Sequence, residues 1–210
     1  MDAKTLTKFD LFRSAVAQFV AFTDDEWEIF QSHLKVLTLN KKEYLAEVGK
    51  VCNYIGYIVS GATRCFHIKD GSIITSYFSL EGEMVTSYKS FLTSTASPHA
   101  IQCIEKTELV VFSFADLQAL ANHELLALKM ERFGRLVAEF LIFCYEDRIT
   151  SFVTLNPEER YINLMAKSSN IIQRIPQHYI ANYLGITPVS LSRIRRRIMA
   201  PHKELHQILD

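Results

Sequence analysis

The sequence predicts an α+β fold in which a central antiparallel β-roll, jelly-roll-like in its double layer of strands, lies between helical segments. Three observations support this prediction. Residues 36–114 alternate apolar and polar side chains with a period of two and are divided by glycines, which is typical of short antiparallel strands. On either side of that region the apolar spacing changes to three and four, which indicates helices. The chain of 210 residues is long enough for one or two domains with a sizeable core.

Two helices are expected before the strands. Apolar side chains three and four positions apart predict an amphipathic helix over residues 5–22. Thr23 then has the spacing of a capping box with Glu26, so a second helix should begin there and run to about Leu34.

The strands are short runs of β-branched and aromatic residues at about ten-residue spacing. Asp70 and Gly71 join two of these runs. Both residues tolerate positive φ, so the pair is a strong signal for a two-residue hairpin turn. The region therefore reads as an antiparallel roll, barrel or sandwich.

A long helix is predicted over residues 123–154, at roughly 45 Å from the rise per residue. It carries two apolar stripes, and one of them has heptad spacing. We expect one stripe to lie on the roll and the other to bind a second copy of the chain, which makes this a dimerisation helix; the alternative is a core helix of a monomer. The heptad positions are Leu126, Met130, Phe133, Val137, Phe140 and Cys144.

Pro157 ends this helix, because proline restricts the residue before it to extended conformations. We accordingly divide the chain into a sensor domain (1–122), the dimerisation helix (123–154) and a C-terminal domain (155–210).

The most specific motif is QHYIANYLGITPVSLSRIRRR, residues 177–197. Gly185 stands where a short helix would end with positive φ. Thr187 and Pro188 provide the N-cap and the first position of a second helix. This spacing predicts a helix-turn-helix.

If the apolar stripe of the second helix is buried, its arginine-rich face points outward, as a helix that reads the major groove requires. The residues expected to contact DNA are Thr187, Val189, Ser190, Ser192, Arg193, Arg195, Arg196 and Arg197. The alternative is a pair of ordinary amphipathic helices with a solvated basic face. Residues 157–210 carry eight Lys/Arg and four Asp/Glu, so an acidic body precedes a basic end, which also hints at nucleic acid.

The sequence does not support a membrane protein, a secreted protein, a metalloprotein or an enzyme. No apolar run reaches 18 residues and no secretory signal is visible, so we expect a cytoplasmic protein without a membrane partner. The four cysteines lack metal-ligand spacing, which favours reduced thiols and no metal or other cofactor. The sequence contains no nucleophile-elbow, Walker-loop or dinucleotide-binding motif, so we do not expect an enzyme.

Over roughly residues 20–200 the chain resembles the Crp/Fnr family of bacterial transcription regulators. The resemblance rests on the run YIGYIVSG with the following TRCFHIKDG, on SLEGEM, and above all on QHYIANYLGITPVSLSRIRRRI. It implies a homodimer that joins a cyclic-nucleotide-binding-type roll to a C-terminal winged helix-turn-helix. The implied partners are double-stranded DNA, a small-molecule effector of unknown identity, and RNA polymerase.

The resemblance also implies site residues. Family members often read bases from the first, second and sixth positions of the recognition helix, which are Pro188, Val189 and Arg193 here. Only Arg193 matches the usual residue type, and Val189 can contact a thymine methyl group. The operator should therefore differ from the best-known one of the family.

In nucleotide-binding members a cassette begins with Gly-Glu and ends near an arginine that neutralises the phosphate. Gly82 and Glu83 match the start, but His99 stands near the end and the arginine is missing. Lys89 or His99 would have to replace it. We therefore expect an effector other than cAMP in a pocket formed by these four residues. The alternative function is a roll that binds a ligand and signals to a protein partner without contacting DNA.

Overall fold

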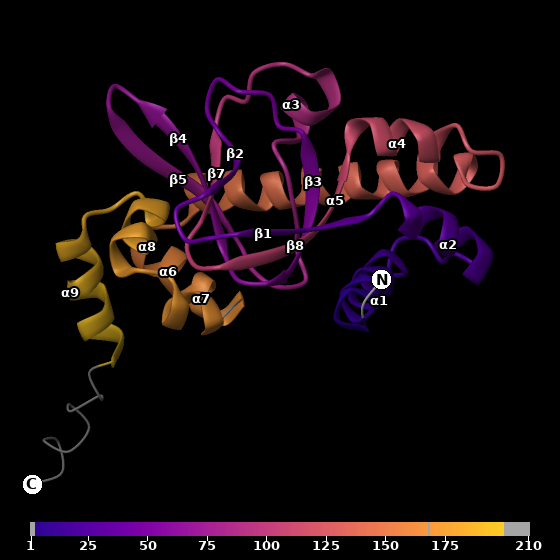
Figure 1. Ribbon diagram of the computed structural model, residues 1–210. Coiled ribbons are helices and arrows are strands. Elements are labelled where there is room, and N and C mark those ends of the chain that lie inside the picture. The colour runs from indigo at the N-terminus through magenta and orange to yellow at the C-terminus, as the bar shows by residue number, and fades with distance from the viewer. Residues whose placement is uncertain (1–2, 168, 200–210) are drawn as a thin grey trace, which may run out of the picture.

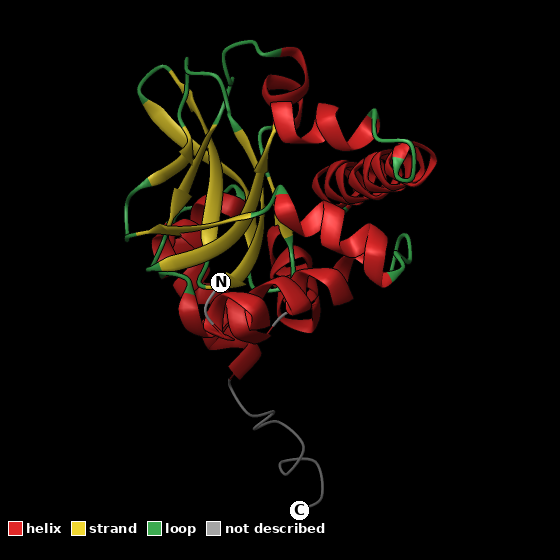
Figure 2. Ribbon diagram, turned by 45° about the vertical axis from the view of Figure 1, so that its right-hand side comes forward, coloured by secondary structure: helices red, strands yellow, loops and turns green. Residues whose placement is uncertain are grey.

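The computed structural model describes residues 3–167 and 169–199. Its two sheets are stacked into a roll, with helices at both ends of the chain, so the predicted α+β class is confirmed (Figure 1). Figure 2 shows the sheets on one side and the long helix end-on beside them. Among the described helices, none is both long and apolar enough to cross a bilayer.

The roll has the strand orders β1-β8-β3-β6 and β2-β7-β4-β5, with antiparallel neighbours throughout. This pairing of first with last strand is the jelly-roll arrangement. Asp70 and Gly71, both at positive φ, form the turn between β4 and β5, as the sequence predicts. The strands are β1 Lys35–Leu39, β2 Tyr44–Ala46, β3 Tyr54–Ser60, β4 Thr63–Lys69, β5 Ser72–Ser79, β6 Met84–Val85, β7 Ala100–Cys103 and β8 Thr107–Ser113.

The N-terminal helices cover one side of the roll. The first helix ends at Val16, six residues before its predicted end, and a turn leads to the second. The predicted capping box is present: Thr23 Oγ1 accepts from the Glu26 amide at 3.3 Å, and Glu26 accepts from the Thr23 amide at 2.7 Å. The helices before the long one are α1 Ala3–Val16, α2 Asp24–Ser32, α3 Tyr88–Thr93 and α4 Phe114–Ala121.

The long helix α5 (Ala127–Thr154) runs along the roll from α4 to the C-terminal helices (Figure 1). Leu126, Met130 and Phe133, the first half of the predicted heptad stripe, are buried in the chain's own sensor core. That half of the stripe is therefore not available to a partner. The apolar side chains that remain exposed on the second half of α5 are Phe140, Ile142, Phe143, Tyr145, Ile149, Phe152 and Val153.

The C-terminal helices pack on the roll. They share one core cluster with Ala62, Phe78, Leu80 and Ile104 of the sensor. Asn156 starts this unit, because its side chain accepts from the amides of the first turn of α6. The helices are α6 Pro157–Lys167, α7 Ser169–Arg174, α8 Gln177–Leu184 and α9 Pro188–Met199. No strand occurs among the described residues of this region, and residues 200–210, where a wing could follow, lie outside them.

Candidate functional site

The helix-turn-helix predicted from residues 177–197 is present as α8 and α9. Gly185 ends α8 with φ 72°, and its amide donates to Asn182 O at 3.1 Å. Thr187 caps α9, because its Oγ1 accepts from the Ser190 amide at 3.1 Å. The segment is therefore two helices joined by a tight turn.

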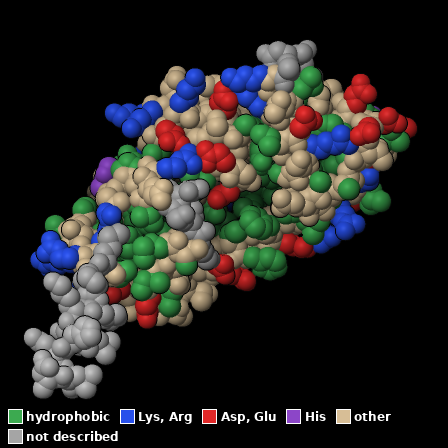
Figure 3. Space-filling view, turned by 90° about the horizontal axis from the view of Figure 1, so that it is seen from below, with side chains coloured by type: hydrophobic (Ala, Val, Ile, Leu, Met, Phe, Trp, Pro, Cys, Tyr) green, Lys and Arg blue, Asp and Glu red, His purple; other side chains and the backbone are tan. Residues whose placement is uncertain are grey.

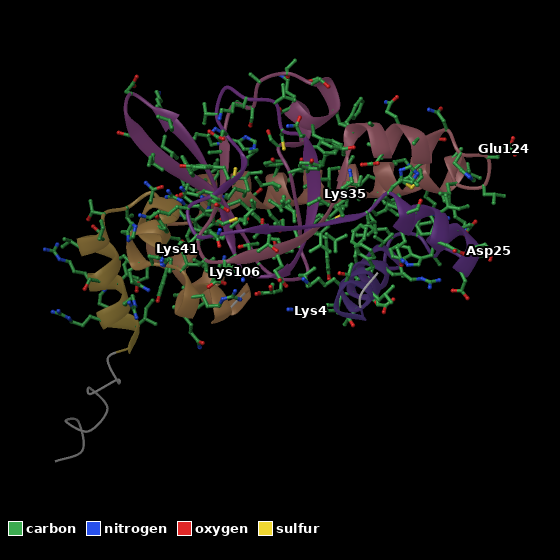
Figure 4. All side chains as sticks on the ribbon, viewed as in Figure 1. Lys4, Asp25, Lys35, Lys41, Lys106 and Glu124 are labelled. Carbon is green, nitrogen blue, oxygen red and sulfur yellow. The ribbon has the colours of Figure 1, made fainter. Side chains whose placement is uncertain are left out.

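Burial separates the two faces of α9 as the spacing predicts. Leu191 and Ile194 are buried against α8, whose Ala181 is completely buried where the helices approach. Arg193 and Arg196 are exposed. In Figure 4 nitrogen-tipped side chains on the outer side of α9 point away from the rest of the molecule, and Figure 3 shows Lys and Arg side chains at that end as well as elsewhere on the visible face. The exposed face can reach acceptors in a DNA groove.

The other residues predicted to contact DNA differ in how exposed their side chains are. Thr187, Val189 and Ser192 are exposed, with 61% of Val189 accessible, and Ser190 is half-buried beside the cap. Arg195 is half-buried, and its Nε has no hydrogen-bond partner among the described residues.

Arg197 is exposed but forms an ion pair with Glu158 at the start of α6. To contact DNA, Arg197 would have to leave this carboxylate or share itself between the two. Arg193 and Arg196 are therefore the arginines best placed to reach DNA.

Four polar contacts made by two side chains hold this unit on the roll, and the sequence analysis predicted none of them. Asn182 of α8 accepts from the Thr75 amide at 2.5 Å and donates to Ile73 O at 2.7 Å, so it pairs with the edge strand β5 as another strand would. Arg174 pairs with both Glu81 and Glu105. Nothing in the local pattern of α8 marks Asn182, because its partner is about 107 residues away in sequence.

Two more contacts cross the same interface. The Arg64 guanidinium lies 3.9 Å from the centre of the Tyr179 ring. The rings of Phe78 and Tyr183 lie 5.3 Å apart, centre to centre. Cation–π and aromatic pairs of this kind add to the apolar contact between the roll and α8.

The structure does not bring the four residues predicted to form an effector pocket into one cavity. Gly82 is on an exposed turn, Lys89 is exposed on α3, and the His99 ring packs edge-on against His67 at 5.3 Å. Glu83 alone lines a cavity of about 460 Å³ between the roll, α5 and the C-terminal helices.

Glu83 is half-buried in this cavity. Burial raises its pKa to about 7, although hydrogen bonds with the Tyr77 hydroxyl and the Leu80 main chain act in the opposite direction. The carboxyl group is therefore poised to titrate near neutral pH. The cavity holds no position for His99 or Lys89, so these two residues do not complete a site with Glu83 there.

In the segment that corresponds to the nucleotide cassette, buried serine hydroxyl groups form hydrogen bonds within the chain. Ser87, Ser90 and Ser97 are buried. Ser90 Oγ accepts from the Cys52 amide at 2.9 Å, and Ser97 Oγ donates to Ser87 Oγ at 2.8 Å. These hydroxyl groups therefore hold the loop through bonds within the chain.

Comparison with solved structures identifies the fold. The regulator CLP of Xanthomonas campestris, described as c-di-GMP responsive, matches with a TM-score of 0.65 at 15% identity over 84% of this chain and 91% of its own. FixK2 of Bradyrhizobium japonicum matches at 0.64 and 18% identity, over 79% of this chain and 84% of its own. A protein of Eubacterium rectale assigned to the Crp/Fnr family of transcriptional regulators matches at 0.63 and 16% identity, over 84% and 83%.

No family model and no curated protein sequence matches the chain. The fold is nevertheless similar to that of solved Crp/Fnr-type regulators across most of its length, which confirms the fold that the resemblance in the sequence implies.

Proposed function

We propose that the protein is a cytoplasmic, non-enzymatic transcription regulator that binds double-stranded DNA as a homodimer. The observation that carries the proposal is the division of α9, whose Leu191 and Ile194 are buried while Arg193 and Arg196 are exposed. Arginine can bond both acceptors of guanine in one plane, and the remaining cationic side chains can hold phosphates. The regulator fold of the solved relatives supports the same function.

The dimer is proposed to form through the second half of α5. Ile142, Tyr145 and Ile149 follow one another at steps of three and four, and each is more than half exposed. Val153, four residues on, is 79% exposed. A row with this spacing is typical of the seam of a two-stranded coiled coil. Leaving these apolar side chains exposed to water in a monomer would be unfavourable. Two recognition helices about one DNA turn apart would then meet a roughly palindromic site.

The DNA proposal is tested with the full-length protein. Fragments bound by the wild type are selected from genomic DNA, and affinity is measured by gel shift at several salt concentrations. Arg193→Ala should weaken binding to the selected site by about tenfold or more and relax the preference at one base pair, since a bidentate contact is worth about 1–3 kcal/mol. Arg132→Ala, an exposed arginine near the other end of α5, is the matched control.

Binding that is insensitive to salt, or equally weakened by both substitutions, would contradict the proposal. In that case the alternative, a sensor that signals to a protein partner, would be favoured. RNA polymerase is proposed as a further partner of the DNA-bound dimer, and a pull-down on operator DNA would test it.

The dimer is tested separately by sedimentation. Ile149→Glu should shift the protein toward monomer, because it places a charge in the proposed seam. Ile68→Glu, on an exposed isoleucine of β4, is the control and should leave the mass unchanged. A wild type that sediments as a monomer at micromolar concentration would refute this interface.

A further inference from the structure

The cavity beside Glu83 joins all three parts of the molecule. One wall comes from β5 and the loop residue Glu83 of the roll, a second from the end of α5, and a third from α6, α7 and α8. A molecule bound there would touch the sensor, the long helix and the helix-turn-helix unit at once. Its volume of about 460 Å³ lies in the range of small-molecule sites.

Two arginines define the chemistry of this cavity. Arg148 of α5 donates to Tyr183 O at 2.6 Å, and Arg160 of α6 donates to Leu155 O at 2.8 Å and to Leu184 O at 3.0 Å. Both guanidinium groups therefore bond to main-chain carbonyls at helix ends. Neither lies within 4.0 Å of a carboxylate oxygen in the part of the chain that the structure describes.

The two positive charges also lie close together. Both guanidinium groups stack on the Phe152 ring, at 4.4 Å for Arg148 and 4.6 Å for Arg160. Burial, and to a smaller extent the neighbouring Arg160, lowers the pKa of Arg148. The Nε of Arg160 is buried and has no hydrogen-bond partner among the described residues. Two like charges in one cavity with an unused donor are an arrangement that an anion would relieve.

The other residues that line the cavity indicate which kind of molecule it would fit. The rings of Tyr77, Phe78 and Tyr183 border it, and the side chains of α5 and α6 that complete it carry hydroxyl and amide groups and the carboxylate of Asp147. Aromatic walls favour a planar, partly apolar molecule, and Glu83 in its protonated form can donate to an acceptor on it.

We propose that this cavity binds a small organic anion with a planar body, held at its anionic group by Arg148 and Arg160. The site belongs to the junction of the domains rather than to the interior of the roll. Its regulatory consequence rests on the proposed function: the bound anion would fix the helix-turn-helix unit against α5 and thereby change operator affinity.

Binding is tested on the full-length protein by calorimetry and by the thermal midpoint. The probes are phenyl phosphate, benzoate and inorganic phosphate, with phenol as the uncharged control. We expect phenyl phosphate or benzoate to bind and to raise the midpoint, and phenol to do neither. The comparison of the two aromatic anions shows whether phosphate or carboxylate is preferred. No binding of either aromatic anion, or equal binding of phenol, would overturn the proposal.

Substitutions locate the site. Arg148→Gln and Arg160→Gln should each weaken binding of the preferred anion at least tenfold, and Arg148→Lys should weaken it less, because it keeps the charge but not the planar fork. Arg132→Gln should have no effect. Unchanged affinity in both cavity variants would place the anion elsewhere and refute the assignment.

A second readout does not depend on the arginines, whose loss could unfold the chain. Benzoate stays ionised between pH 6 and pH 8, so its affinity should fall several-fold over that range as Glu83 ionises beside it. Asp147, Arg148, Arg160, Tyr77, Tyr183 and Cys144 also face the cavity. Glu83→Gln should remove the fall, and a fall that persists in this variant would contradict the site.

DNA binding is measured in parallel, which separates the two proposals. If DNA binds and no anion does, the cavity assignment fails and the proposed function stands. If an anion binds in the cavity and no DNA fragment is selected, the regulator function fails instead.

Discussion

Glu83→Gln should remove a pH dependence of folding stability. The pKa of Glu83 is raised from 4.5 to about 7 in the folded chain, with burial as the largest cause. Between these two values the folded chain keeps a proton that the unfolded chain has released. The free energy of unfolding should therefore be greatest below about pH 4.5 with respect to this group, fall as the pH rises to about 7, and stay level above it.

The magnitude follows from the size of the shift. A difference of about 2.5 pKa units corresponds to a loss of at most ~3 kcal/mol, less where water screens the carboxylate. Glutamine is neutral at every pH and keeps an acceptor for the Tyr77 hydroxyl. The variant should thus match the wild type near pH 4.5 and exceed its stability by up to ~3 kcal/mol at pH 8.

Urea unfolding at pH 5, 6, 7 and 8 measures this difference. Glu124→Gln is the control, because Glu124 is exposed at the end of the molecule far from α9 (Figure 4). The control should follow the wild type at every pH. A Glu83→Gln difference that is the same at pH 5 and pH 8 would refute the reasoning, since it would mean that Glu83 titrates alike in the folded and unfolded chains.

Three further substitutions test the packing. Gly61→Ala should lower stability by about 3 kcal/mol or more in thermal unfolding, because φ is +103° and a Cβ would lie 2.6 Å from Thr107 atoms; Gly71→Ala, strained but with open space, should lose only about 1 kcal/mol. Asn182→Ala removes both hydrogen bonds to β5 and should cost about 1–3 kcal/mol, with faster amide exchange on that strand; unchanged exchange would argue against the contact. Thr187→Ala should cost about 0.5–2 kcal/mol of stability through the lost cap of α9, and a neutral effect in denaturant unfolding would show that the cap is not needed.

Most of the fold could be predicted from local patterns in the sequence. The Thr23 capping box, the Asp70-Gly71 turn and the Gly185 helix end were all predictable, because each depends on a few neighbouring residues with restricted backbone conformations. The burial of Leu191 and the exposure of Arg193 followed from helical periodicity alone.

Other features were set by contacts between distant segments. The heptad stripe on α5 was real, but its first half, from Leu126 to Phe133, is buried in the chain's own core. Periodicity shows that a helix has an apolar face and not which surface will cover it. For the same reason the sequence did not indicate that Arg197 would form an ion pair with Glu158.

By itself the sequence determined the succession of helices and strands, the roll, and a two-helix unit with an arginine face, because these follow from spacing and from backbone preference. Only the tertiary structure decided that Glu83 shares a cavity with Arg148 and Arg160, and that His99 does not line it but packs against His67. That grouping joins a loop residue of the roll and residues of two helices up to 77 positions apart, and only the packing of the roll against α5 and α6 brings them together.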